Sequence, residues 1–241
     1  MLLLSRRDLL KICRKDIAYF ILLGVILAAV QFTYLYTISR IPIAAAILIQ
    51  YQSPVLIALH ARIVRKKRFS PFALVAIVGA VAGCYLVVGA YNLALFSLNR
   101  TGILSGLASA GVFAWYAVKS EDGMHAYSGW TLLVYALLAA AAVWNVLQPP
   151  LVSFRGGYDI RSWGYILYIG IFGTILPFGL YNAGIKAIEA THAGVTAMLE
   201  PVFAGIIAYS LFGEVLEPWQ IAGAVLVIGS ILLLQVQKSR Q

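Results

Sequence analysis

Long apolar stretches separated by short polar segments dominate the hydrophobicity pattern of the chain. A helix needs about 20 apolar residues to cross a hydrocarbon core about 30 Å thick, and stretches of that length recur. We predict spanning helices over residues 17–39, 42–61, 71–93, 101–119, 129–148, 162–185, 191–213 and 218–237. The pattern therefore predicts an all-α membrane protein with about eight transmembrane helices.

The composition agrees with a lipid environment. Hydrophobic residues make up 62% of the 241 positions, charged residues only 11%, and the mean hydropathy is +0.89. A soluble domain of this size needs more polar residues to cover its surface, whereas helices that face lipid can be apolar all round. The composition excludes an ordinary soluble protein and makes the lipid bilayer the main surroundings of the chain.

The net charge of +9 would suit a nucleic-acid-binding protein if the basic residues covered one face. They gather instead at the ends of predicted helices, in two clusters: Arg6, Arg7, Lys11, Arg14 and Lys15, and Arg62, Arg65, Lys66, Lys67 and Arg68. This distribution is typical of cytoplasmic segments beside anionic lipid, and it disfavours a nucleic-acid partner.

The same charges orient the predicted helices. If the amino terminus is cytoplasmic, inside segments hold 14 Lys and Arg residues and outside segments hold four. Cytoplasmic loops of membrane proteins carry the excess of Lys and Arg. We predict a multi-pass protein of the cell membrane (plasma or inner membrane) with both termini cytoplasmic.

The chain resembles itself at an offset of 147 residues without gaps. The matched pairs are Tyr34 and Tyr181, Pro54 and Pro201, Val55 and Val202, and Pro71 and Pro218. The offset predicts a first repeat of three helices over residues 1–95 and a second of five over residues 96–241. An odd number of crossings separates the copies, so they would be inverted, which is an architecture of transporters.

The first repeat is shorter than the second. The helices over 101–119 and 129–148 open the second copy, and their partners would precede Met1. We expect that two helices are missing, through an incomplete reading frame or a misplaced start. The alternative is a protein that naturally begins with half a repeat.

Glu200 is the main candidate functional residue, because it lies near the middle of a predicted span. An ionisable group inside a membrane faces the bundle or a water-filled cavity. His192, Thr196 and Glu200 are four residues apart and form a polar stripe on one helix face, which could line a substrate pathway. The alternative is structural: His192 caps the helix, Thr196 bonds its own backbone and Glu200 makes one hydrogen bond.

Two prolines add to this region. Pro54 and Pro201 are repeat partners, and each removes a backbone donor and frees carbonyls in its helix. The residues before Pro54 are unusually polar for a span. The remaining candidates for the same cavity are Tyr51, Gln52, Ser53, Asn182 and Tyr116. For the aromatic residues, ordinary packing or anchoring at the membrane interface is the favoured alternative.

Enzyme and metal motifs are absent from the sequence, which has no phosphate-binding glycine loop, no HExxH and no GxSxG. We therefore expect neither an enzyme, nor a cofactor, nor a metal site. Gly79 with Gly83, and Gly102 with Gly106, have the GxxxG spacing that lets helices approach closely, within one bundle or between the two copies of a homodimer.

The stretch from Tyr181 to Leu234 resembles the carboxyl-terminal repeat of EamA-type permeases of the drug/metabolite transporter superfamily. The shared features are small residues at Ala190, Ala193 and Gly194, then Glu200 with Pro201, then Gly213 and Glu214. The resemblance implies ten helices in two inverted five-helix repeats, so this chain would lack the first two. It also implies that the first helix lines the substrate cavity.

We thus expect a secondary transporter or exporter of small organic metabolites, such as amino acids or related solutes, working by alternating access and coupled to protons. The rival hypothesis is a non-transporting protein, either a truncated fragment or a membrane scaffold. The missing helices are the observation behind that rival.

Overall fold

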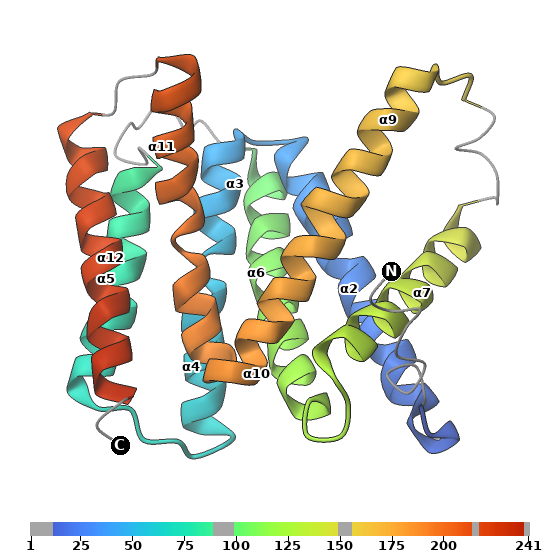
Figure 1. Ribbon diagram of the computed structural model, residues 1–241, viewed down its shortest axis with the longest axis horizontal. Coiled ribbons are helices and arrows are strands. Elements are labelled where there is room, and N and C mark those ends of the chain that lie inside the picture. The colour runs from blue at the N-terminus through green and yellow to red at the C-terminus, as the bar shows by residue number, and fades with distance from the viewer. Residues whose placement is uncertain (1–11, 89–98, 149–155, 214–216, 239–241) are drawn as a thin grey trace. The chain divides into compact units, whose positions relative to one another are not determined.

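The computed structural model describes residues 12–88, 99–148, 156–213 and 217–238, and within these ranges the regular elements are all helices. Figure 1 shows them. The elements are η2 (Arg14–Asp16), α2 (Ile17–Ile38), α3 (Ile43–Gln50), α4 (Ser53–Ile63), α5 (Pro71–Val87), α6 (Arg100–Gly123), α7 (Gly129–Leu147), α9 (Ile160–Tyr168), the π-helical η4 (Ile169–Ile175), α10 (Leu176–Ala197), α11 (Glu200–Phe212) and α12 (Pro218–Lys238).

Each predicted span corresponds to helix in the described residues, which confirms the all-α fold class. By length and composition, the segments Arg14–Ile38, Arg100–Gly123, Gly129–Leu147 and Ile160–Ala197 are long and apolar enough to cross a membrane. The predicted spans over 42–61 and 191–213 are instead divided, each by two residues in a turn. The last residues of the predicted span 71–93 lie outside the described residues.

The chain forms two compact units, which are considered separately below. One unit combines residues 1–30 with 115–189, and the other combines 31–114 with 190–241. We call them the first and the second unit. Each unit contains residues from both predicted repeats. The boundary between the repeats, after residue 95, stays a prediction from sequence self-similarity.

Small residues bring α5 and α12 together in the second unit, where Figure 1 shows the two helices side by side. A Cβ atom on Gly83 would lie 2.8 Å from the carbonyl oxygen of Gly223, and one on Gly79 would lie 2.5 Å from the Ser230 hydroxyl. The GxxxG spacing thus acts within this chain, between its own helices. Ala76, Ala80, Val227 and Ile231 form the buried seam of the pair.

The second GxxxG pair lies on α6, where Gly102 faces the residues just before α3 and Gly106 faces the end of α3. A Cβ atom on Gly102 would lie 2.6 Å from Ile41 Cγ2, and one on Gly106 would lie 3.0 Å from Ile49 Cγ2. The Ser105 hydroxyl donates a hydrogen bond of 2.9 Å to the carbonyl of Thr33 in α2. Small residues therefore let α6 approach α2 and α3 closely.

In the first unit, hydrogen bonds fasten the beginning of α2. The Tyr19 hydroxyl donates to the Lys119 carbonyl at 2.5 Å, and the Tyr127 hydroxyl donates to Asp16 Oδ2 at 2.5 Å. The bond to the carboxylate raises the pKa of the Tyr127 phenol, because ionisation would place two negative charges side by side.

A strained residue divides α10. Glu189 has φ 68° and ψ 161°, a conformation that glycine adopts readily and other residues rarely. It precedes the eight residues 190–197, just as its repeat partner Pro42 precedes the eight-residue α3. Pro42 has φ −53° and carries no such strain.

We therefore expect Glu189→Gly to stabilise the protein, because glycine relieves a cost of about 1–3 kcal/mol at this backbone conformation. Glu189→Val should destabilise it. The melting temperatures of the two purified variants in detergent check this, and a lower value for Glu189→Gly than for the parent chain would contradict it.

Candidate functional site

Two interrupted helices form the centre of the candidate site in the second unit. Tyr51 and Gln52 separate α3 from α4, and their repeat partners Met198 and Leu199 separate α10 from α11. Figure 1 shows α4 continuing from α3 and α11 continuing from α10. Interrupted helices of this kind expose backbone groups that can bind ions and solutes in transporters.

The two interruptions have the same pattern of backbone hydrogen bonds. The amide of Gln52 donates to the carbonyl of Ile49 at 3.1 Å, and the amide of Leu199 donates to that of Thr196 at 3.1 Å. The next bonds also match, from Leu56 to Gln52 at 3.2 Å and from Phe203 to Leu199 at 3.0 Å. All four pairs of atoms obey the 147-residue offset.

Proline explains where each helix restarts. Pro54 and Pro201 are the second residues of α4 and α11. Proline has no amide hydrogen to give to the carbonyl one turn earlier, but it fits the first turn of a new helix. The carbonyl left without that donor at the second interruption is the carbonyl of Ala197.

Tyr51 and Glu200 connect the two interruptions. The Tyr51 hydroxyl donates a hydrogen bond of 2.7 Å to Glu200 Oε2, and it lies 3.4 Å from the Ala197 carbonyl oxygen. Glu200 is the first residue of α11, where the helix dipole favours a negative charge. Its side chain is exposed, and in the described part of the chain no cation forms an ion pair with it.

The neighbours of this pair come from several helices of the second unit. Tyr34 of α2 and Cys84 of α5 are near enough to interact electrostatically with Glu200. Sequence reasoning did not select either residue, because a tyrosine and a cysteine in apolar spans resemble ordinary packing. Ser53 and Pro54 at the start of α4 are buried, and a Cβ atom on Gly194 would lie 3.3 Å from the Pro54 ring.

The rest of the predicted stripe lies along α10. The Thr196 hydroxyl donates to the carbonyl of His192 at 2.8 Å within its own helix, as the structural alternative expected. His192 is half-buried. Glu200, the last residue of the stripe, reaches across to the α3–α4 segment through its hydrogen bond with Tyr51.

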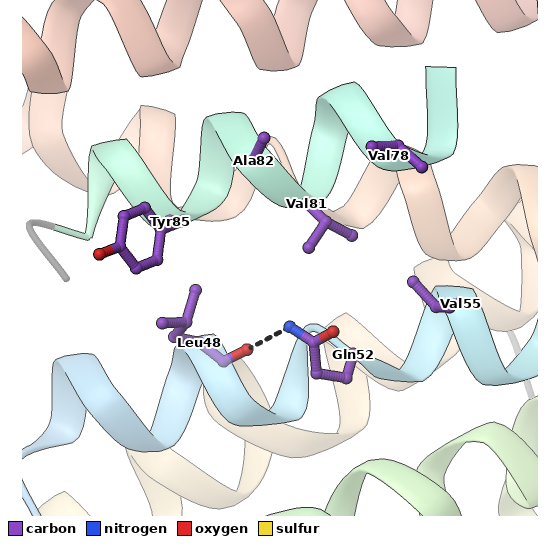
Figure 2. Close-up of a pocket in the computed structure, with 7 residues that line it drawn as sticks. All are labelled: Leu48, Gln52, Val55, Val78, Val81, Ala82 and Tyr85. Carbon is purple, nitrogen blue, oxygen red and sulfur yellow. Dashed lines mark hydrogen bonds between the residues drawn. The ribbon is translucent and has the colours of Figure 1, made fainter. Parts of the chain in front are cut away.

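Gln52 faces a different neighbour from Tyr51. Its side-chain nitrogen Nε2 lies 3.4 Å from the Leu48 carbonyl oxygen, and the residue lines an open pocket of about 450 Å³. Figure 2 shows Val78, Val81, Ala82 and Tyr85 of α5 on the other side of that pocket. Because the lining is almost wholly apolar, this pocket offers no charged group to a solute.

Tyr116 and Asn182 belong to the first unit, where they bind each other. Asn182 Nδ2 donates to the Tyr116 hydroxyl at 3.1 Å and lies 3.3 Å from the Gly129 carbonyl. Both side chains are fully buried, and the Phe178 ring packs edge-on against Tyr116. Their polar groups satisfy each other inside a packed core, in line with the packing alternative for Tyr116.

Comparison with known proteins identifies the family. The model of the EamA-like transporter family matches residues 1–89 and 100–236. The chain belongs to the EamA-like transporter family. Members are transporters and not enzymes, so this chain is a multi-pass membrane transporter of small molecules.

Two named relatives are transporters, and a solved structure has a similar fold. An uncharacterized transporter of Archaeoglobus fulgidus is 29% identical over 201 residues, covering 83% of this chain and 70% of that protein. The threonine/homoserine exporter RhtA of Escherichia coli is 22% identical over 212 residues, covering 87% and 66%. A crystal structure covering 99% of this chain and 82% of its own matches with a TM-score of 0.78 at 20% identity, which shows the fold.

Proposed function

We propose that this EamA-like transporter exports small metabolites with an amino group, of the amino-acid class, in exchange for protons. The observation that carries the proposal is the Tyr51–Glu200 pair, which places an exposed carboxylate between two interrupted helices. A carboxylate in an apolar span is a functional group by default. It can hold a substrate ammonium group or a proton.

Competition for this carboxylate would couple the export of substrate to the entry of protons. A proton and an ammonium group cannot occupy the Glu200 carboxylate together, so the arrival of one favours the release of the other. The cycle needs two conformations, in which the carboxylate faces opposite sides of the membrane in turn. A proton or a substrate shifts the equilibrium between them only if it binds one conformation more tightly than the other. That cycle is proton-driven alternating access.

The 147-residue offset supports an inverted-repeat architecture for this cycle. The equivalent helices begin at partner positions, Ser53 with Glu200 and Pro71 with Pro218. In transporters with inverted repeats, the substrate site lies at interrupted helices near the membrane midplane. The excess of inside charges supports a cytoplasmic position for both termini.

A relative and the site chemistry together support the substrate class. The Escherichia coli relative is named as an exporter of threonine and homoserine. An amino acid carries the ammonium group that a carboxylate such as Glu200 can bind by a charge-assisted hydrogen bond.

A competition assay tests the substrate class. The purified chain is reconstituted in liposomes, and uptake of labelled L-threonine is measured with a tenfold excess of unlabelled competitors. We expect homoserine and other amino acids to compete, and hydroxy acids that lack the amino group not to. Equal competition by the hydroxy acids would contradict the pairing of ammonium with Glu200.

A further inference from the structure

The Tyr51 hydroxyl lies between the Glu200 carboxylate and the Ala197 carbonyl, on opposite sides of the second interruption. We infer that Tyr51 is a positioning residue that transmits the protonation state of Glu200 from one interrupted helix to the other. The inference rests on the proposed function, because it explains how a proton at Glu200 changes the contact between the α3–α4 and α10–α11 segments.

The Tyr51 hydroxyl has one hydrogen and two acceptors within reach. Glu200 Oε2 at 2.7 Å is the better acceptor now, and the Ala197 carbonyl at 3.4 Å is the alternative. Pro201 lies four residues after Ala197 and has no amide hydrogen to give to that carbonyl. Proline thus keeps the second acceptor open for the tyrosine.

Protonation of Glu200 moves this hydrogen bond. When Glu200 is ionised, Tyr51 donates to Oε2, because an ionised carboxyl group only accepts hydrogen bonds. When a hydronium ion gives one proton to the carboxylate and leaves as water, the new carboxyl O–H donates to the Tyr51 oxygen. Tyr51 keeps its own hydrogen and turns it toward the Ala197 carbonyl. One O–H bond breaks, on the hydronium ion, and one forms, on Glu200, while the O–H bond of Tyr51 stays intact.

The other groups near Glu200 do not compete for this role. Tyr34 of α2 and Cys84 of α5 are ordinarily uncharged near neutral pH. His192 lies two turns earlier on α10, and its carbonyl accepts from Thr196. At the other end of α4, His60 and Arg62 lie in the last turn, away from the interruption at Tyr51.

The bond shift therefore reverses the bond between Tyr51 and Glu200 and strengthens a second link from α3–α4, to Ala197. With an ionised Glu200, Tyr51 is bound to the first residue of α11. With a protonated Glu200, it is bound also to the last residue of α10, on the opposite side of the interruption. Exchange of one bound substrate for another needs no such shift, because the proton never enters that cycle.

Two assays on proteoliposomes separate these steps, with L-threonine as the probe. Exchange of internal for external L-threonine reports binding and reorientation. Accumulation driven by an acidic interior reports coupling to protons. We expect Tyr51→Phe to keep exchange within about twofold and to lose accumulation by about tenfold or more, where tenfold corresponds to about 1.4 kcal/mol of coupling. Tyr209→Phe, on the exposed side of α11, is the matched control and should behave as the parent chain.

Each contrary result has a distinct meaning. Undiminished accumulation by Tyr51→Phe overturns the inference and leaves the proposed function standing. Loss of both assays at an unchanged melting temperature also overturns it, because Tyr51 would then be a substrate contact. If the parent chain neither exchanges nor accumulates L-threonine, the proposed function itself fails.

A second variant decides the matter if Tyr51→Phe does not fold. Pro201→Ala gives the Ala197 carbonyl a backbone amide donor one turn later and leaves both side chains of the Tyr51–Glu200 bond in place. We expect Pro201→Ala to keep exchange and to lose accumulation. Accumulation at the level of the parent chain would overturn the inference.

Discussion

Glu200→Gln lowers both exchange and proton-driven accumulation of L-threonine by about 10- to 100-fold, which is the fold-change expected from the loss of one charge-assisted hydrogen bond worth about 1.5–3 kcal/mol. Glutamine keeps the size of the side chain and its hydrogen bond with Tyr51. It cannot bind a proton, and it cannot neutralise a substrate ammonium group. The measurement is initial uptake by proteoliposomes that contain equal amounts of purified protein.

The control for this variant is another carboxylate of the second unit. Glu217 is exposed and immediately precedes α12, where its backbone amide donates a hydrogen bond to Gln220 Oε1. Glu217→Gln should transport as the parent chain does. If Glu200→Gln also transports at the parent rate, Glu200 neither couples protons nor binds the ammonium group.

Gly83→Ala is expected to destabilise the protein by about 1–3 kcal/mol, because the added methyl group overpacks the contact between α5 and α12. The new carbon atom would lie 2.8 Å from the Gly223 carbonyl oxygen and 2.9 Å from the Val227 amide nitrogen. Both atoms are backbone, so the two helices must separate. A melting curve in detergent, followed by tryptophan fluorescence, measures the effect.

Gly229→Ala is the matched control on α12. A Cβ atom there would meet no atom of another helix within 4 Å, so alanine should be neutral or stabilising through its higher helix propensity. A Gly83→Ala protein that melts at or above the temperature of Gly229→Ala would show that close approach of α5 and α12 does not hold the second unit together.

Much of the fold could be predicted from the hydrophobic pattern, because apolar stretches of membrane-spanning length are long and strongly apolar. The prolines at 54 and 201 marked the two disturbed helices. The sequence did not predict how each disturbance is built. Two residues in a turn followed by a new helix, with proline in its first turn, depend on backbone geometry that hydropathy does not contain.

The candidate site was harder to predict, because neighbouring residues at an interruption do not follow the helical period. Tyr51 and Gln52 are adjacent in sequence, yet Tyr51 binds Glu200 and Gln52 lines an apolar pocket. The sequence suggested that Asn182 and Tyr116 belong to the same cavity, but in the first unit they hydrogen-bond to each other, and Asn182 also donates to the Gly129 carbonyl. The positive φ of Glu189 has no sequence signal, since glycine is the residue expected there.

Proton-driven accumulation of L-threonine by the parent chain is the most direct test of proton-coupled export through Glu200. Proteoliposomes with an acidic interior are diluted into neutral buffer that contains labelled L-threonine, with or without a protonophore, beside matched vesicles of Glu200→Gln. We expect accumulation by the parent chain alone, and its collapse when the protonophore dissipates the gradient. Accumulation that persists without the gradient, or that Glu200→Gln supports equally, would contradict proton-coupled transport through Glu200.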